Sequence, residues 1–253
     1  MRGMTLAELM AWQPPYSSYI IEKGILVPGT KMAIFGRYQT WKSMITIDAA
    51  FCIGTGKPWL GFKTAKTTSY VVQAEIPQAQ FRERVAKYAL GNKVDTGNVY
   101  LATEPYIKLD KGFGVGELDK ELSRTGARLL IIDPVFKMVS GRLTDEYDMR
   151  QFFDRMDLLA AKYNFSLILI HHDRKHLIQD GQIFSMGAED MFGSYMQNWC
   201  DTIIRTETTD TDGEVKLTFE KVRHSSEEIR PILVTVDRDT LRFSRKEFGK
   251  KGG

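Results

Sequence analysis

The sequence is poor in the residues that cross-link small folds or bind zinc. Among 253 residues it has two cysteines, Cys52 and Cys200, and four histidines. Two distant cysteines provide neither a disulfide framework nor a zinc-binding pattern. We interpret both as reduced and largely buried, as is usual in the cytoplasm. The chain is therefore expected to be cytoplasmic and to fold around a hydrophobic core without cross-links.

Long apolar runs are also absent. The longest have the length of a β-strand, which excludes a transmembrane helix and membrane partners. The segment from Met1 to Pro14 lacks the apolar region of a signal peptide. A strong charge bias is missing too, because the net charge is +3 and the pI about 8.7. This excess permits nucleic-acid binding but does not argue for it, so any contact with DNA must come from local loops.

The composition is that of an ordinary globular protein. Hydrophobic residues make up 43% and charged residues 26% of the chain, which excludes a disordered or collagen-like sequence. Strand-like and helix-like segments alternate, which predicts an α/β domain with a mostly parallel sheet flanked by helices. Strands are expected at Lys31–Phe35, Thr67–Ala74, Val99–Ala102, Leu129–Asp133 and Ser166–His171, and helices at about Lys42–Cys52, Gln78–Leu90, Val115–Leu122 and Tyr147–Tyr163.

The pattern changes after residue 200. Strands are expected at Thr202–Glu207, Val215–Lys221 and Ile232–Val236, and Asp212-Gly213 is a typical hairpin turn between the first two. We therefore expect a C-terminal antiparallel extension of the sheet. The predicted organisation is a polar N-terminal arm over residues 1–28, one domain over residues 29–244, and a flexible basic tail over residues 245–253.

The segment after the first strand has the order of a phosphate-binding loop. Its residues are Gly36, Arg37, Tyr38, Gln39, Thr40, Trp41, Lys42 and Ser43, with Met44 continuing into a helix. In such a loop the backbone N–H groups and the helix N-terminus hold the phosphates, while the lysine reaches the β- and γ-phosphates and the hydroxyl binds Mg²⁺. The segment therefore predicts Mg-ATP binding, with Lys42 and Ser43 in those two roles.

One position departs from the pattern. Trp41 stands where most such loops have glycine, so its side chain must project out of the loop or crowd the phosphate. The alternative is an ordinary strand, turn and helix with a chance Lys-Ser pair. A second glycine-rich segment, Gly54-Thr55-Gly56-Lys57, follows a helix instead of a strand and ends at Pro58, so we interpret it as a plain loop.

Two carboxylates follow predicted strands. Asp133 ends a continuous apolar strand, where a Walker B aspartate would help to hold Mg²⁺; capping of the turn before Pro134 is the other interpretation. Many P-loop ATPases have a glutamate directly after that aspartate, and Pro134 occupies this position. Glu75, at the end of the strand Tyr70–Ala74, is the candidate base because carboxyl ends of parallel strands face the ligand. Its alternative role is a charge at a helix start.

Other polar residues are open to two interpretations. His171 and His172 end a buried strand, where one of them is a candidate γ-phosphate sensor; a metal site with His176 is the competing hypothesis. Lys221 and Arg223 are either a solvated pair on a strand or a pair that reaches the ATP of a neighbouring subunit. The glycines in Gly112–Gly116 lack the spacing of a dinucleotide fingerprint, so we expect a loop leading into a helix.

In this order the motifs resemble the RecA-like ATPases of the DnaB/RepA helicase type, especially the short plasmid- and phage-borne hexameric RepA-like forms. The resemblance covers about Pro14 to Phe243. It rests on the lead-in Tyr19–Gly29, the phosphate loop, Gln73–Pro77 with Phe81–Arg84, Leu130–Pro134, Ile168–Lys175, Gly193-Ser194 and Lys221–Arg223. It implies a RecA-like P-loop core of residues 29–244.

The resemblance also implies roles for single residues. Lys42 would hold the phosphates, Glu75 would polarise the attacking water, and Asp133 would orient the water shell of Mg²⁺. His172, or less readily His171, would sense the γ-phosphate. Arg84, or else Arg82, would stack on adenine, and Lys221 and Arg223 would complete the site of the neighbouring subunit.

Single-stranded DNA and further copies of the chain are the partners that the resemblance implies. Two loops, about Phe136–Tyr147 and Asp173–Phe192, would face the channel of a hexameric ring, where Lys137, Arg142, Arg174 and Lys175 would contact phosphates. The separate N-terminal domain of DnaB-type helicases has no counterpart, so the arm is a candidate for packing on an adjacent subunit.

Three functional hypotheses follow. The first is a ring-forming motor for DNA replication, a helicase that hydrolyses ATP and translocates on single-stranded DNA. The second is a RecA- or KaiC-like ATPase for recombination or regulation that does not unwind DNA. The third, motivated by Trp41, is a non-catalytic assembly module that binds nucleotide or DNA.

Overall fold

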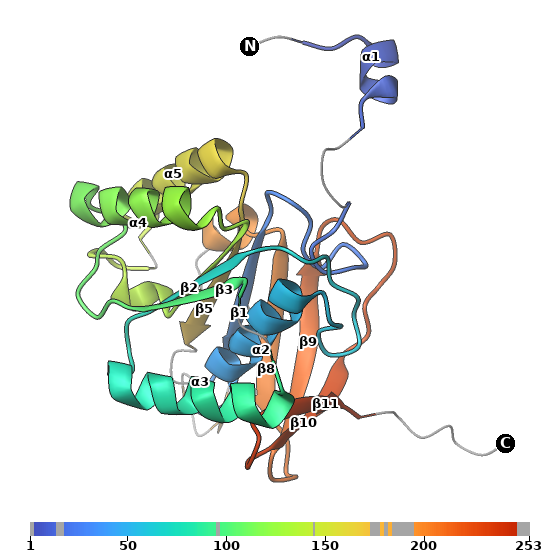
Figure 1. The fold of residues 1–253 in the computed structure, drawn as a ribbon, viewed down its shortest axis with the longest axis vertical. Helices are drawn as coiled ribbons and strands as arrows, with labels where there is room; N and C mark the ends of the chain where they lie inside the picture. Colours follow the sequence, from blue (N-terminus) through green and yellow to red (C-terminus); the bar gives the residue numbers. More distant parts are fainter. Residues whose placement is uncertain are drawn as a thin grey trace, which may run out of the picture.

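A single large sheet organises the protein in the computed structural model (Figure 1). The structure describes residues 3–13, 18–94, 97–143, 145–172, 178–179, 182–183 and 195–246. Within them the strand order is β11-β10-β9-β8-β1-β5-β4-β2-β3. The strands of the sheet are β1 (Lys31–Gly36), β2 (Ser69–Gln73), β3 (Val99–Thr103), β4 (Leu129–Asp133), β5 (Ser166–His172), β8 (Thr202–Thr208), β9 (Glu214–Val222), β10 (Ile232–Asp237) and β11 (Arg242–Arg245).

The sheet has a parallel part and an antiparallel part. β8, β1, β5, β4, β2 and β3 pair in parallel, whereas β9, β10 and β11 extend the β8 edge in antiparallel pairs. This confirms the predicted parallel core with a C-terminal antiparallel extension. Asp212-Gly213 joins β8 to β9, as its turn chemistry predicts. A separate pair, β6 (Ile178–Gln179) and β7 (Gln182–Ile183), is antiparallel.

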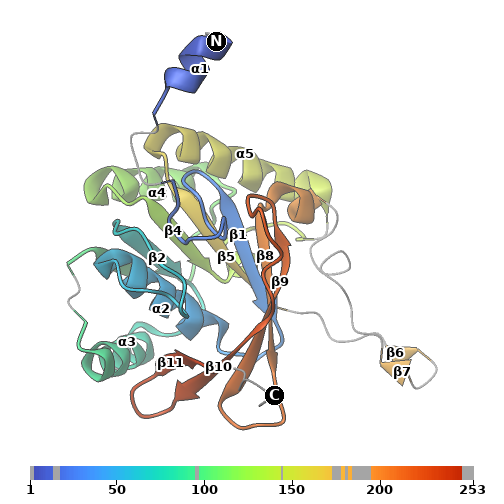
Figure 2. The ribbon, with the colours of Figure 1, turned by 90° about the vertical axis from the view of Figure 1, so that its right-hand side faces the viewer.

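Helices cover both faces of the sheet (Figure 2). The helices are α1 (Leu6–Ala11), α2 (Lys42–Thr55), α3 (Gln78–Asn92), α4 (Gly112–Thr125) and α5 (Glu146–Tyr163), with a 3₁₀ turn η1 (Val135–Lys137); residues 195–199 are also helical. Because both faces are covered, the middle residues of the central strands are apolar, and β4 is buried along its whole length.

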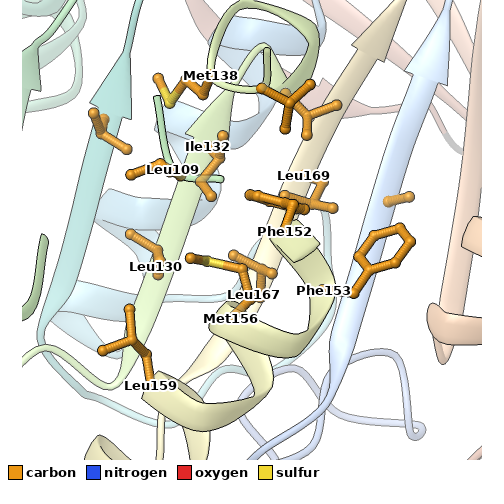
Figure 3. Packing of buried hydrophobic residues seen from close by; sticks show 14 of the residues in the cluster. Leu109, Leu130, Ile132, Met138, Phe152, Phe153, Met156, Leu159, Leu167 and Leu169 are labelled. Atoms are coloured by element: carbon orange, nitrogen blue, oxygen red, sulfur yellow. The ribbon is translucent and has the colours of Figure 1, made fainter. Parts of the chain in front are cut away.

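Two apolar layers hold the helices to the sheet. On one face α5 places Phe152 and Met156 over β5 and Phe153 over β1, as Figure 3 shows. On the other face α2 packs Ile45, Ala49 and Ile53 against the same strands. Each fully buried side chain of this size contributes about 1.5–3 kcal/mol through removal of apolar surface from water. This two-sided packing fixes where the strands end, and therefore where the polar groups at their carboxyl ends lie.

The N-terminal segment divides into two parts. α1 is capped by Thr5 and Glu8, buries none of its residues and lies away from the sheet in both views (Figures 1 and 2). By contrast, Ile20, Ile21 and Leu26 are buried in the core. The part of residues 1–28 that follows residue 18 therefore packs with the domain. No helix among the described residues combines the length and apolar character needed to cross a bilayer.

Three elements differ from the sequence expectation. The helix α1 lies in the segment expected to be a polar arm, where no helix was predicted, and β11 adds a strand after Ile232–Val236. Gly112–Gly116, expected to be a loop, forms the first turns of α4. The glycine-rich helix start has a packing reason: a Cβ on Gly114 would lie 2.2 Å from the carbonyl oxygen of Lys108.

Candidate nucleotide-binding site

The phosphate loop lies between β1 and α2, at the carboxyl end of the parallel strands. Gly36 begins it with φ 155°, and a Cβ there would lie 2.3 Å from the carbonyl oxygen of Thr206 on β8. Gln39 and Trp41 both have left-handed φ values, 63° and 62°, which turn the chain back into α2 at Lys42. The structure therefore shows the strand, turn and helix that the motif predicts.

Lys42 is buried and its ammonium group points into the loop. Its Nζ donates to the carbonyl oxygens of Gly36 (2.8 Å) and Arg37 (2.5 Å) and to Oγ1 of Thr40 (3.2 Å). Phosphate oxygens are stronger acceptors for an ammonium group than neutral carbonyls or hydroxyls. The N-cap residue of α2 makes no side-chain hydrogen bond to the first helical N–H groups. The lysine and the helix N-terminus are thus placed to receive an anion.

The Trp41 side chain leaves the loop toward the far edge of the sheet. Its indole meets the ring of Phe243 on β11 edge to face, with 6.5 Å between ring centroids and 78° between planes. It also packs against the apolar layer that contains Ile45 and against the cluster around Met44. The indole is therefore held between α2 and the last strand.

Asp133 ends β4 beside Ser43, the first-turn hydroxyl of α2. Burial raises the pKa of Asp133 to about 6, an effect opposed by a hydrogen bond from Ser43 and by the charge of Lys42. The Oδ1 atom is buried and has no hydrogen-bond partner among the described residues. A buried carboxylate oxygen beside a hydroxyl suits Mg²⁺, which takes oxygen ligands and keeps several waters. The residues present therefore fit the expected metal.

Glu75 follows β2 and His172 ends β5, and the two side chains meet at the carboxyl end of β4, the strand between them. Oε2 of Glu75 lies 3.4 Å from Nε2 of His172. The His172 imidazole, and then the charges of Lys137 and Lys42, lower the pKa of Glu75. The carboxylate is 38% exposed, so an ionised group remains accessible to water.

The imidazole of His172 lies between two aromatic rings. Tyr38 of the phosphate loop stacks on it, with 4.9 Å between centroids, and Phe136 meets it edge to face at 5.7 Å. His172 pairs in register with Gly36, whereas His171 lies one residue earlier on β5 and is buried. The structure thus places His172 in contact with both Glu75 and Tyr38 of the phosphate loop.

Lys221 and Arg223 lie at the opposite end of the strands, near the start of β1 and far from the phosphate loop. Val222 pairs with Thr202 of β8, and Thr202 pairs with Met32 near the start of β1. Gly36, where the phosphate loop begins, pairs with Thr206, four residues further along β8. Nζ of Lys221 donates to the carbonyl oxygens of Gln197 and Cys200, both at 2.7 Å, and burial lowers its pKa. These residues therefore do not meet the phosphate loop of their own chain.

Arg223 is held at the same end of the strands but remains half exposed. Its guanidinium donates to Oδ1 of Asp201 at 2.7 Å and to the carbonyl oxygen of Asn198 at 2.9 Å, and its side chain is 48% exposed. Both terminal nitrogens of the guanidinium are thus bonded within the chain, and the exposed part of the side chain is accessible to a neighbouring molecule.

The remaining predicted residues are exposed or lie outside the described part of the chain. Arg82 and Arg84 are exposed on α3, and Lys137 and Arg142 are exposed after β4. Arg174, Lys175 and His176 lie outside the described residues. Among the described residues no group of three His, Cys, Asp or Glu side chains is placed to bind a metal ion. Thr206 and Phe243, which contact the loop, were not identified from the sequence because they lie far along the chain from it.

Together the fold and this site define a P-loop ATPase of the RecA-like class. The profile of a family described as an AAA domain matches residues 2–176, which is more than half of the chain, and the chain belongs to that family. A search of curated proteins found no match.

Solved structures show the same fold. One of them, an ATPase domain, superposes with a TM-score of 0.66 and 11% identity, covering 91% of this chain and 93% of that one. "Crystal structure of the RadB recombinase" gives 0.60 and 14%, covering 87% and 92%. A structure described as that of a DnaB-like replicative helicase and its interactions with primase gives a TM-score of 0.66 and 11% identity, covering 87% of this chain and 59% of that one. These likenesses confirm the predicted RecA-like fold of this chain.

Proposed function

We propose that this chain is a Mg-ATP-dependent, ring-forming DNA motor, a replicative-type helicase that translocates on single-stranded DNA. The observation that carries the proposal is that the candidate groups lie at two opposite ends of the strands of one sheet. Lys42, Asp133, Glu75 and His172 converge at the carboxyl end, and Lys221 with Arg223 lies at the other end. Such a set becomes complete only when two copies stand side by side, as in a ring.

In this proposal the chain's own residues position the nucleotide and the water. Lys42 and the N–H groups at the start of α2 bind the β- and γ-phosphate oxygens. Asp133 and Ser43 hold Mg²⁺, Asp133 partly through water. Bound Mg²⁺ neutralises charge on the phosphates. His172, in contact with Glu75, is positioned to report whether the γ-phosphate is present.

Glu75 is the group that activates water in this proposal. Its lowered pKa keeps it ionised near neutral pH, so it accepts a hydrogen bond from water and orients the water toward the γ-phosphorus. Arg223 of an adjacent copy then stabilises the charge of the transferring phosphoryl group, with Lys221 beside it. Arg84 or Arg82 on α3 stacks on the adenine.

Assembly and DNA contact have separate supports. Leu6, Leu9 and Met10 of α1 are between 56% and 75% exposed, and apolar surface of this kind is typical of a protein contact. Lys137 and Arg142 are exposed after β4, and Arg174 and Lys175 complete the proposed DNA-contacting set. The free cysteines, Cys52 and Cys200, support a cytoplasmic location.

The deciding measurement is ATP turnover with and without single-stranded DNA, paired with negative-stain imaging in both states. We expect turnover that rises with DNA, and rings of the chain on DNA. The absence of turnover with nucleotide binding intact would leave a non-catalytic module as the function, and the absence of Mg-nucleotide binding at millimolar concentration would refute the ATPase itself.

A second candidate function comes from the likeness to the RadB recombinase. A recombination or regulatory ATPase would form filaments or rings and would not unwind DNA. Strand displacement from a forked duplex, run beside a strand-exchange assay, separates the two functions. We expect displacement without exchange, and the reverse result would favour the recombinase.

A further inference from the structure

The indole of Trp41 creates a conformational problem in the phosphate loop. Trp41 has φ 62° and ψ 13°, a left-handed conformation that places Cβ close to the following carbonyl group and that bulky residues rarely adopt. Glycine takes this conformation without that cost. The neighbouring structure must therefore favour the left-handed state of Trp41 over its alternatives.

The ring of Phe243 is the contact that can supply this preference. The two rings meet edge to face, at 6.5 Å and 78°, a favoured geometry for aromatic pairs. Phe243 is itself fixed, because it lies on β11 and pairs in register with Val236 of β10. The pair also joins two apolar clusters, since both rings pack against the layer of Ile45 and the cluster of Met44.

We propose that Trp41 and Phe243 are positioning residues that hold the phosphate loop in its nucleotide-binding shape. Without the ring of Phe243 the indole loses its aromatic partner, and Trp41 can leave the left-handed conformation. The N–H groups at the start of α2 then lose their alignment toward the phosphates. The last strand of the chain thereby sets nucleotide affinity in a loop that has no glycine before its lysine. This inference rests on the proposed nucleotide binding.

The coupling has a distinctive consequence. A glycine at position 41 reaches the left-handed conformation unaided, so it removes the need for Phe243. The effect of Phe243→Ala on nucleotide affinity should therefore be present in the wild-type chain and absent in Trp41→Gly. A merely structural role of Phe243 in the sheet would give the same loss in both backgrounds.

The test is a double-mutant cycle on the dissociation constant of Mg-ADP, measured by titration calorimetry on the full chain. Phe243→Ala is expected to raise the constant about two- to tenfold, the range given by an aromatic pair. The cycle compares the effect of Phe243→Ala within each background, so the double variant should bind Mg-ADP as tightly as Trp41→Gly, whatever the affinity of Trp41→Gly itself. In ATP turnover, Phe243→Ala should raise KM and leave kcat near its wild-type value.

Phe219→Ala is the matched control. Phe219 on β9 meets Phe62 edge to face at 5.7 Å and 77°. The control therefore removes an aromatic pair of similar geometry that packs against the same apolar layer but includes no residue of the phosphate loop. Its melting temperature is expected to fall while its affinity for Mg-ADP stays unchanged. Phe243→Leu, which keeps apolar volume but removes the ring, supplies the comparison if Phe243→Ala does not fold, and should weaken binding in the same direction.

Two results would overturn the inference. One is independent effects of the substitutions at positions 41 and 243, and the other is unchanged affinity in both Phe243 variants. With the wild type still binding Mg-ADP, either result rejects only the positioning role. If the wild type itself binds no Mg-ADP, the proposed function and this inference fail together.

Discussion

The hydroxyl oxygens of Thr40 and Thr206 lie 2.8 Å apart and join the phosphate loop to β8. Each hydroxyl also lies within hydrogen-bonding distance of a backbone carbonyl oxygen, Thr40 near that of Arg37 (2.9 Å) and Thr206 near that of Phe35 (3.1 Å). Because a hydroxyl has one proton, one threonine donates to the other threonine, which in turn donates to its own carbonyl. Nζ of Lys42 donates to the same Thr40 hydroxyl. A residue on β8 is thus linked, through one hydroxyl, to the lysine expected to hold the phosphates.

Thr206→Val should loosen this link. Valine keeps the branched shape but removes the hydroxyl, and a lost hydrogen bond of this kind costs about 0.5–1.5 kcal/mol. We expect the dissociation constant of Mg-ADP to rise about two- to tenfold, measured by titration calorimetry. Thr218→Val on β9 is the control, because the Thr218 hydroxyl is buried without a hydrogen-bond partner among the described residues. Equal effects of the two substitutions would contradict the proposed link.

Lys42→Ala should reduce ATP turnover about a hundredfold or more. The substitution removes a preorganised positive charge from the site where negative charge develops. Lys57→Ala is the control, since Lys57 belongs to the second glycine-rich segment and is exposed after α2. Steady-state phosphate release measures both variants. Wild-type turnover in Lys42→Ala would refute the assignment of Gly36–Ser43 as the phosphate loop. A loss of turnover in Lys57→Ala would instead point to the second glycine-rich segment.

Arg223→Ala should abolish turnover while nucleotide binding stays close to wild type. An arginine acting across an interface is worth about 10³–10⁵-fold in kcat, and Arg223 does not meet the phosphate loop of its own chain. Arg230→Ala, which removes an exposed arginine before β10, should remain active. Because Arg223 also pairs with Asp201, melting temperatures of both variants show whether folding is affected.

A mixing experiment tests whether two copies of the chain share one active site. Lys42→Ala and Arg223→Ala are each expected to be inactive alone. When the two are mixed and reassembled, some interfaces combine an intact Lys42 from one copy with an intact Arg223 from the next. Turnover should therefore return in part. Mixtures as inactive as the separate variants, with rings still present by negative stain, would exclude an active site shared in this way.

Asp48 should make the protein less stable as pH rises from about 4 to about 6. It lies on α2, accepts a hydrogen bond from Tyr88 at 2.5 Å, and burial raises its pKa from the ordinary 3.8 to about 6. In this interval the unfolded chain binds fewer protons at Asp48 than the folded chain, so the free energy of unfolding falls with pH. The full loss above pH 6 is about 3 kcal/mol.

Asp48→Asn provides the comparison for this effect. The amide cannot ionise, and its oxygen still accepts from Tyr88. We expect denaturant unfolding to show a flatter pH dependence between 4 and 6, and a more stable variant at pH 7. A variant whose stability follows pH as steeply as the wild type in that interval would assign the dependence to other groups.

The sequence predicted the parts that are written in contiguous stretches. The apolar strand Leu129–Asp133 and the strand, turn and helix around Gly36–Ser43 are confirmed, because burial on both sheet faces and phosphate-loop geometry each require particular residues within a few positions. The carboxylates Glu75 and Asp133 were placed at strand ends for the same reason. β11 and α1 were missed, because a four-residue strand and a six-residue helix are too short for a clear period.

Read alone, the sequence determined which segments form strands and helices, since the spacing of apolar residues follows the repeat of each element. It also predicted a turn with the residue order of a phosphate-binding loop after the first strand. Only the tertiary structure decided that Thr206 and Phe243 contact this loop, and that Arg223 lies at the opposite end of the strands. Such contacts join residues far apart in the chain, where strand pairing sets the neighbours and no local pattern records them.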